Sequence, residues 1–255
     1  MCFDLDSSPP VPPISGAAVS HDDVVLEAAD GNRLAAFSAA PQEASGVGVV
    51  VLPDVRGLYR FYEEVALRIA EHGYSAVAID YFGRSAGVGK RGDDFEYMPH
   101  VEQTTPAGVQ QDVAAAVARL RSPEGGSCSR IVTLGFCFGG RNSWLAAAGG
   151  HDLVGAIGFY GRPGAGRDGS PGPIQRAAEM ACPVLALQAG ADRNITAEDN
   201  AAFDEALTAA RVEHEVVSYP GAPHSFFDKK QGEFSAESED AWSRVLDFLE
   251  RHGRS

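Results

Sequence analysis

Uninterrupted apolar runs alternate along the chain with segments whose apolar residues recur at helical spacing. A short apolar run of about four to eight residues is typical of a strand that is covered on both faces of a sheet. Two extended runs, 23–28 and 33–39, flank the turn residues Asp30-Gly31-Asn32 and predict an antiparallel hairpin. Further strands are predicted at 46–53, 74–80, 130–136, 153–160, 182–190 and 213–220.

Between these strands the apolar spacing becomes helical. Strands that alternate with helices form a mostly parallel sheet with helices on both faces. We therefore expect one α/β domain over residues 20–255, preceded by a Pro-rich extended arm over residues 1–19. Residues 83–106 are polar and rich in glycine, which predicts a loop or lid. Helices are predicted at 61–72, 109–120, 139–148, 197–210 and around 242–249.

The composition narrows the classes of partner. The 255 residues carry a net charge of −14, which argues against nucleic acid or an anionic membrane because both need basic surfaces. The chain has no run of about 18 apolar residues, and its amino-terminal segment lacks the features of a secretory signal. Without a signal or zinc-type spacing, the four cysteines predict reduced thiols in the cytoplasm. A monomer or a small homo-oligomer is expected.

The segment "TLGFCFGG" (133–140) places one cysteine between glycines, after a predicted strand and before a predicted helix. This pattern has the form of a nucleophile elbow with Cys137 in place of the commoner serine. Gly135 and Gly139 are expected to leave room for a sharp turn, and the helix that starts at Phe138 directs its positive end at the sulfur. The alternative is a buried apolar cysteine, but that reading leaves the glycines unexplained.

A nucleophilic cysteine requires a base, and the base requires an orienting acid. Asp192 lies in "AGADRNI" after the strand at 182–190, and His224 lies in "GAPHSFF" after the strand at 213–220. The order nucleophile, acid, histidine is that of hydrolases with this kind of elbow. Taken singly, Asp192 could be a turn or capping residue and His224 a surface histidine. Because the carboxyl ends of parallel strands meet at one edge, we expect the three residues to converge.

These three motifs resemble those of dienelactone hydrolase and its relatives in the α/β-hydrolase superfamily, from about residue 20 to the carboxyl end. The resemblance implies an α/β-hydrolase fold and cleavage of enol-lactones or other activated esters through an acyl-thioester. It implies Cys137 as the nucleophile, His224 as the base and Asp192 as the acid. Neither a metal nor an organic cofactor is implied.

The resemblance also implies an oxyanion site made by the backbone N–H groups of Phe138 and of Val55 in "LPDVRG". The family commonly has a glutamate where this chain has Asp54, and that glutamate contacts the resting thiol and takes its proton when substrate arrives. Aspartate is one methylene shorter. Tyr160, at the end of "AIGFYG", is expected to line the pocket or to pack beside the elbow.

Arginine side chains are the expected binding partners of a substrate carboxylate. Arg84 in "DYFGRSAG" matches a family arginine that binds a substrate carboxylate. The second family arginine, four residues after the histidine, is replaced by Asp228 in this chain. Arg56 is a candidate to compensate for that loss, whereas Lys90 and Arg91 are expected to be solvated surface charges.

The sequence thus predicts a cysteine hydrolase for a small ester or lactone. The alternative is a non-catalytic small-molecule receptor or a thiol redox sensor on the same fold. A complete triad favours the enzyme, because a receptor has no need of an ordered acid and base. Cys137 is expected to alkylate fastest, Cys128 at an ordinary thiol rate from a polar loop, and Cys182 hardly at all.

Overall fold

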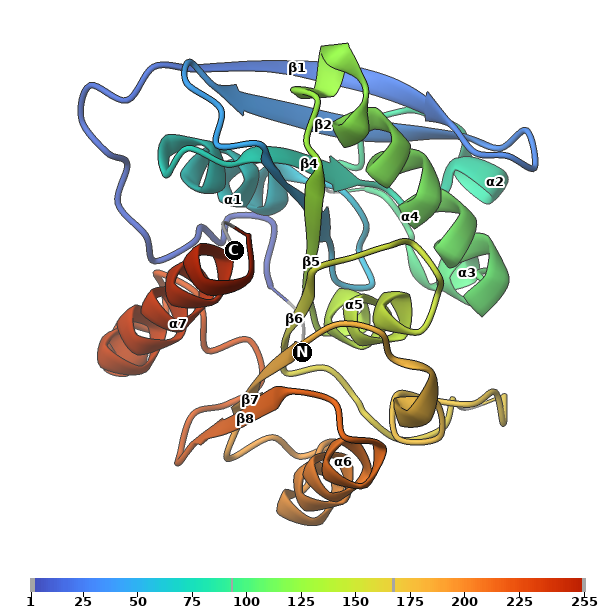
Figure 1. Cartoon of the computed structure of the whole chain (residues 1–255), viewed down its shortest axis with the longest axis vertical. Coiled ribbons are helices and arrows are strands. Elements are labelled where there is room, and N and C mark those ends of the chain that lie inside the picture. The colour runs from blue at the N-terminus through green and yellow to red at the C-terminus, as the bar shows by residue number, and fades with distance from the viewer. Residues whose placement is uncertain (1–2, 93, 167, 254–255) are drawn as a thin grey trace.

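The computed structural model describes residues 3–92, 94–166 and 168–253. Within these residues the chain forms an eight-stranded sheet with the order β1-β2-β4-β3-β5-β6-β7-β8 (Figure 1). The first two strands form an antiparallel hairpin that joins β4, and the other neighbours are parallel. The predicted sheet is therefore confirmed. Its strands are β1 (Val19–Glu27), β2 (Arg33–Pro41), β3 (Val47–Leu52), β4 (Ser75–Ile79), β5 (Arg130–Phe136), β6 (Gly155–Phe159), β7 (Val184–Ala189) and β8 (His214–Tyr219).

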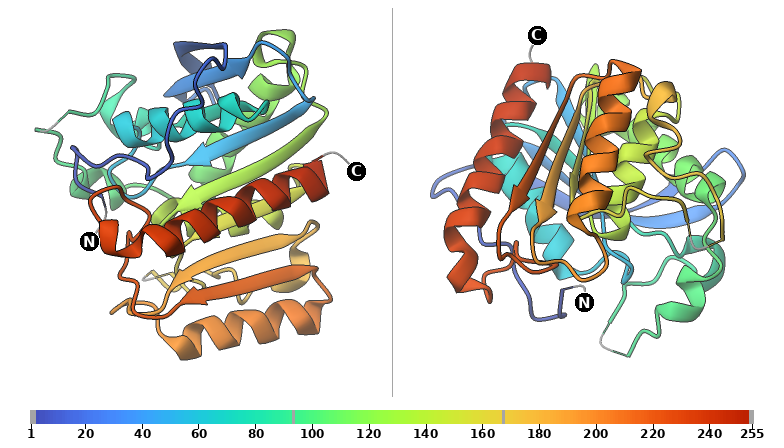
Figure 2. Two further views of the ribbon diagram at one scale, coloured as in Figure 1. Left: turned by 90° about the vertical axis from the view of Figure 1, so that its left-hand side faces the viewer. Right: turned by 90° about the horizontal axis from the view of Figure 1, so that it is seen from below.

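Helices cover both faces of the sheet (Figure 2). The long ones are α1 (Arg60–Glu71), α4 (Pro106–Arg121), α5 (Phe138–Ala147), α6 (Ala197–Ala210) and α7 (Ser235–Gly253). The buried residues of α1 and α7 belong to the core on one face of the sheet. Those of α4, α5 and α6 belong to the cores on the other face. Strand β3 is apolar at every position because both of its faces are buried. Val49 lies in the core on one face of the sheet, and Val50 lies in the core on the other.

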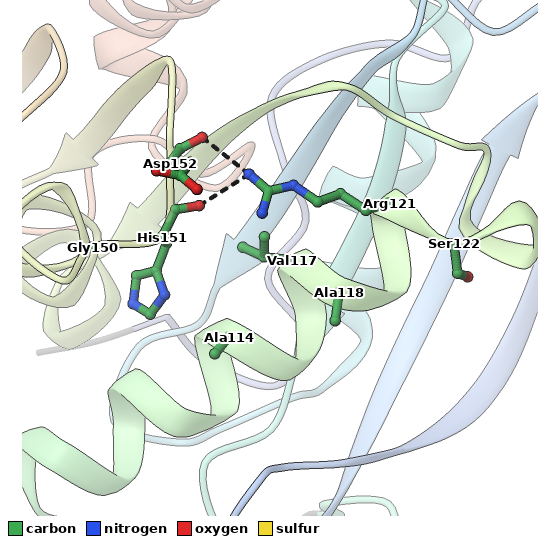
Figure 3. Close-up of a pocket in the computed structure, with 8 residues that line it drawn as sticks. All are labelled: Ala114, Val117, Ala118, Arg121, Ser122, Gly150, His151 and Asp152. Carbon is green, nitrogen blue, oxygen red and sulfur yellow. Dashed lines mark hydrogen bonds between the residues drawn. The ribbon is translucent and has the colours of Figure 1, made fainter.

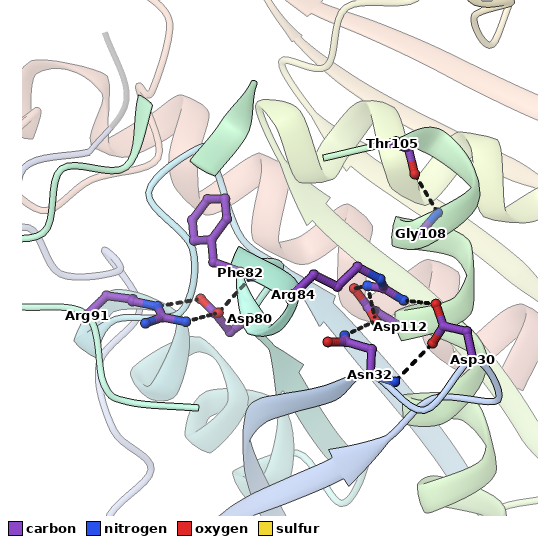
Figure 4. Close-up of polar contacts among 9 residues, drawn as sticks. All are labelled: Asp30, Asn32, Asp80, Phe82, Arg84, Arg91, Thr105, Gly108 and Asp112. Atoms are coloured by element: carbon purple, nitrogen blue, oxygen red, sulfur yellow. Dashed lines mark hydrogen bonds and ion pairs between the residues drawn. The ribbon is translucent and has the colours of Figure 1, made fainter. Parts of the chain in front are cut away.

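The segment predicted as a loop or lid contains two one-turn helices, α2 (Gly83–Ala86) and α3 (Met98–Val101). Its other described residues are largely irregular, as expected. One prediction about this segment was wrong. The side chain of Arg91 is only 5% exposed, and its guanidinium binds the buried carboxylate of Asp80 at 2.8 Å (Figure 4). Arg91 anchors the segment to the end of β4, whereas Lys90 forms the expected surface ion pairs.

The amino-terminal residues 3–18 contain neither helix nor strand in the described chain, yet they pack on the body of the protein. Phe3 lies in the core with 2% of its surface exposed. The division into an arm and a single domain remains a prediction. Among the described residues, no helix has the length and apolar character needed to cross a membrane.

Candidate active site

Cys137 is the single residue between β5 and α5, and its backbone is strained. Its φ is 55° and its ψ is −111°, values that L residues other than glycine seldom adopt. Strain of this kind persists only where the surroundings fix the backbone, and it is concentrated at functional sites. The sharp turn predicted from the glycine pattern is confirmed at this position.

The glycines of the elbow are required by close approach. A Cβ at Gly135 would overlap the carbonyl of Gly139, and a Cβ at Gly139 would overlap the carbonyl of Leu52 at the end of β3. Strand β5 and helix α5 therefore lie against each other and against β3 without intervening side chains. The result is a rigid mounting for Cys137, whose side chain is partly exposed while Phe136 before it is fully buried.

Asp192 and His224 form a close pair. Nδ1 of His224 lies 2.5 Å from Oδ2 of Asp192, with side-chain exposures of 14% for the histidine and 1% for the aspartate. Burial acts to raise the pKa of Asp192, but hydrogen bonds from His224 and from the backbone N–H of Asn194 outweigh it and hold the pKa below its usual value. The carboxylate is therefore ionised at neutral pH and accepts from the imidazole.

Backbone hydrogen bonds fix the loops that carry this pair. The N–H of Ala191 donates to the carbonyl of Ala222 at 2.9 Å, which joins the acid loop after β7 to the histidine loop after β8. Tyr160 connects the pair to the elbow: its ring centroid lies 4.9 Å from that of His224, and the carbonyl of the preceding Phe159 accepts the N–H of Cys137 at 3.0 Å. The three predicted residues thus lie at adjoining loops of one sheet edge.

The loop after β3 lies against the elbow, because the carbonyls of Leu52 and Pro53 approach Gly139. Asp54 is fully buried, and its backbone N–H donates to the hydroxyl of Tyr62 at 3.0 Å. One carboxylate oxygen of Asp54 accepts the N–H of Arg56 at 2.9 Å, and the other lies 3.4 Å from the hydroxyl of Tyr59. Val55 is partly exposed between these anchored residues, as is Phe138 at the start of α5.

Tyr81 was missed by the sequence analysis. Its hydroxyl donates to the carbonyl of Pro53 at 2.9 Å, and its ring meets the edge of Phe138 at 5.2 Å between centroids. Burial, together with the nearby charges of Asp54 and Asp80, raises the pKa of Tyr81 well above its usual value, so the hydroxyl stays a donor. Tyr81 joins the loop after β3 to the start of α5. Only the position directly after a buried strand could have indicated it.

Arg84 is held by carboxylates of the protein itself. Its guanidinium binds Asp112 of α4 at 2.6 Å and Asp30 of the hairpin turn at 2.7 Å (Figure 4). Asn32 also donates to Asp112 at 2.9 Å. Both amino groups of the arginine are therefore engaged with acidic residues, and this geometry supports a structural role instead of the expected contact with a substrate carboxylate.

Arg56 differs from Arg84 in its surroundings. Its guanidinium carbon lies 5.5 Å from the ring centroid of Tyr97, within range of a cation–π contact. Among the described residues its Nε atom has no hydrogen-bond partner. Asp228, where the family has its second arginine, is buried and accepts the backbone N–H of Lys230 at 3.1 Å. Asp228 thus stabilises a local turn.

The cysteines differ in environment, and one expectation about them was wrong. No disulfide forms among the described residues. Cys128 is buried, its thiol donates to the carbonyl of Gly125 at 3.7 Å, and burial raises the pKa of that thiol. Burial raises the pKa of Cys182 to about 12. Cys137 has the most accessible side chain of these three thiols.

A hollow of about 520 Å³ lies between α4 and the turn before β6 (Figure 3). Arg121 donates across it to the carbonyls of His151 and Asp152 at 3.1 and 3.2 Å. These residues lie near the amino ends of β5 and β6, opposite the sheet edge where ligands of such folds bind. The hollow is separate from the site around Cys137.

Comparisons with known proteins identify the family. The model of the dienelactone hydrolase family matches residues 34–253. A Salmonella typhi protein assigned by name as a carboxymethylenebutenolidase is 32% identical over 232 residues, which are 88% of this chain and 84% of that protein. An Escherichia coli K12 protein assigned in the same way is 29% identical, with 96% of this chain and 95% of that protein covered.

Among solved structures, a protein from Klebsiella pneumoniae assigned as a dienelactone hydrolase superposes with a TM-score of 0.79 at 25% identity. The match covers 91% of this chain and 98% of that chain. An acylaminoacyl peptidase from Pyrococcus horikoshii shares the fold, with a TM-score of 0.72 at 17% identity. On the family match, the relatives and the fold, the chain belongs to the dienelactone hydrolase family, a family of carboxylic-ester hydrolases with the α/β-hydrolase fold.

Proposed function

We propose that the protein is a cysteine-dependent hydrolase that cleaves a small ester or lactone through an acyl-thioester on Cys137. The observation that carries this proposal is the contact between His224 and Asp192 at 2.5 Å, beside a strained elbow that presents a partly exposed thiol. A receptor has no need of an ionised, 1% exposed carboxylate that orients a histidine. A thiol nucleophile suits a reducing compartment, so we place the enzyme in the cytoplasm.

The proposed reaction has two halves. In the first, Nε2 of His224 takes the thiol proton of Cys137, the sulfur attacks the carbonyl carbon, and His224 passes that proton to the leaving alkoxide or enolate as the C–O bond breaks to leave an acyl-thioester. In the second, His224 takes a proton from water, the hydroxide attacks the thioester, and the acid is released as the thiolate re-forms. Asp192 holds Nδ1–H of the histidine, which leaves Nε2 as the atom that moves protons.

The oxyanion is proposed to bind the backbone N–H groups of Phe138 and Val55. Phe138 starts helix α5, whose amino end favours negative charge. Val55 follows two residues that are held by tyrosines: the N–H of Asp54 donates to Tyr62, and the carbonyl of Pro53 accepts from Tyr81. Both donors are thus pre-organised. We propose that the fully buried Asp54, whose carboxylate accepts the N–H of Arg56, holds this loop in place, while His224 takes the thiol proton.

The proposal is tested by a burst experiment. An activated p-nitrophenyl ester should release p-nitrophenol in a burst of about one equivalent per chain, followed by slower turnover. Stoichiometric iodoacetamide should remove both phases, and the modified peptide should contain Cys137. Oxidation of that thiol by peroxide, together with binding of esters but no turnover, would instead favour the sensor or receptor.

The thiols give a separate prediction. At neutral pH iodoacetamide should label Cys137 at least about tenfold faster than Cys128 or Cys182, because both of those are buried and have raised pKa values. Time-resolved peptide mass spectrometry measures the three rates in one sample. Equal rates in the folded protein would show that the elbow does not present its thiol.

The arginines yield a prediction about substrate charge. If Arg56 binds a substrate carboxylate, Arg56→Ala should reduce kcat/KM for an anionic lactone by about ten- to a hundredfold relative to its methyl ester. Arg84→Ala should leave this ratio unchanged and instead lower the free energy of unfolding by about 1–3 kcal/mol, because it removes a hydrogen-bond donor from the buried carboxylate of Asp112.

The two variants control each other. The ratio of kcat/KM values for matched charged and neutral substrates reports on recognition, and urea unfolding reports on stability. A change of the ratio in Arg84→Ala, with none in Arg56→Ala, would restore the substrate role that the family resemblance implies for Arg84. A ratio that neither variant changes would show that the substrate is not recognised by its charge.

A further inference from the structure

The amino-terminal segment places one aromatic ring beneath the active site. Phe3 stacks on Phe61 of α1, with ring centroids 3.9 Å apart and planes inclined by 23°. It also meets three other rings edge-on: those of Tyr62, Phe136 and Tyr160, at centroid distances of 6.4, 6.2 and 6.1 Å. Edge-to-face pairs at these distances are attractive and directional. Phe3 is therefore the centre of an aromatic cluster.

Each of the three rings that Phe3 meets edge-on belongs to a different part of the site. Tyr62 accepts the backbone N–H of Asp54 at 3.0 Å and so holds the oxyanion loop. Phe136 is the residue directly before the proposed nucleophile. Tyr160 lies against the ring of His224 at 4.9 Å. One buried ring from the amino-terminal segment thus contacts the supports of the oxyanion loop, the nucleophile and the base.

Tyr160 has the most constrained backbone of these three residues. Its φ is 35°, a backbone conformation that a bulky L residue adopts only where its surroundings hold it there. Its N–H donates to the carbonyl of Leu187 in β7 at 2.8 Å, which fixes the backbone. Its ring is fixed by neighbouring aromatic rings, including that of Phe3. Loss of that ring would open space beside Tyr160 and allow it to move away from His224.

Polar contacts attach the same segment to the rim of the site. Lys230, six residues after the histidine, forms an ion pair with Asp6. The N–H of Lys229 donates to the carbonyl of Ser8 at 2.9 Å. Further along, the N–H of Ile14 donates to a carboxylate oxygen of Glu71 at the end of α1 at 2.9 Å. The segment is tied both to the histidine loop and to the helix beneath the oxyanion loop.

We infer that Phe3 is a positioning residue for the hydrolase reaction: the amino-terminal segment completes the floor of the active site and holds Tyr160, and through it His224, in the reactive geometry. The inference rests on the proposed function. It goes beyond the expectation of an extended arm, because it assigns that arm a part in turnover. Reacting groups that shift by about 1 Å lose up to a hundredfold in rate, so loosened support should be visible in kcat.

The test compares two buried phenylalanines. Phe3→Ala should lower kcat by about ten- to a hundredfold with KM within about twofold, and should slow the alkylation of Cys137. Phe203→Ala is the control, because Phe203 is also fully buried but packs on Trp144 in a different core. It should lose comparable stability and keep its kcat, with both variants assayed well below their melting temperatures. Phe3→Leu, which keeps most of the apolar volume, should recover part of the lost kcat.

A kcat of Phe3→Ala equal to that of Phe203→Ala would overturn the inference and leave Phe3 as core filling. If Phe3→Ala does not fold, the variants Phe3→Leu and Asp6→Ala test the inference instead. A kcat equal to that of the native enzyme in both variants would refute the role of the amino-terminal segment. Failure of the proposed function has a different signature, since Cys137→Ala would then stay active in the background of the native Phe3.

Discussion

Replacing Cys137 with alanine should reduce kcat/KM for an activated ester by roughly 10⁴- to 10⁶-fold while the fold is retained. The proposed reaction forms a covalent bond to the sulfur, and the methyl group of alanine cannot form it. Cysteine and alanine are about equally disfavoured at the positive φ of 55°, so the exchange should change the stability of the fold only slightly. Steady-state kinetics and thermal unfolding measure the two effects.

Cys182→Ala is the matched control. It removes a thiol that lies in another core and is buried, so it should lower stability and leave kcat/KM within about twofold of the native enzyme. Near-native turnover by Cys137→Ala, measured on protein free of contaminating esterase, would show that another residue is the nucleophile.

Asp192→Asn should lower kcat by about 10²- to 10⁴-fold. The amide keeps the shape of the side chain, but its NH2 group can donate to Nδ1 and so favours the histidine tautomer whose proton lies on Nε2. In that tautomer His224 cannot accept the proton of the thiol. The effect should appear in kcat, because the carboxylate acts on the proton transfers and not on substrate contacts.

Asp199→Asn is the control for this exchange. Asp199 lies seven residues further on, in the capping box of α6, where it accepts the N–H of Thr196 at 2.9 Å. Its loss should cost about 0.5–1 kcal/mol of stability and leave kcat unchanged. Equal activity of Asp192→Asn and the native enzyme would exclude Asp192 as the orienting acid.

The pH dependence of stability follows from the same carboxylate. The pKa of Asp192 is lowered from its ordinary 3.8, so its pair with His224 stabilises the folded state above that value. This contribution is lost as the pH falls through the lower folded-state pKa. The free energies of unfolding of Asp192→Asn and of the native protein should therefore approach each other as the pH drops below about 4. Urea unfolding at several pH values measures this difference.

The sequence predicts those parts of the fold that depend on local pattern. Helix α6 occupies Ala197–Ala210, the range predicted from its apolar spacing, because Thr196 begins it with a capping box. The turn at Cys137 is predicted because only glycine fits where Gly135 and Gly139 meet neighbouring backbone. The capping box and the contact of Gly135 with Gly139 both join residues a few positions apart, so the local sequence indicates them.

Long-range pairing is where sequence reasoning fails. Arg84 lies 28 residues from Asp112 and 54 from Asp30, and no local pattern indicates that these residues bind one another. Arg91 has the sequence context of a surface charge, yet the fold places it on Asp80 in the interior. Phe3, in a Pro-rich segment, packs against rings such as Phe61 of α1 and Phe136 of β5, which only the fold brings to it.

The acyl-thioester on Cys137 can be trapped. A slowly deacylated ester is mixed with the enzyme, the reaction is quenched in acid within the burst phase, and the intact mass and its peptide map are recorded. We expect one acyl group per chain, located on the peptide that contains Cys137 and discharged by neutral hydroxylamine. Turnover without any adduct, or an adduct on a peptide that lacks Cys137, would contradict it.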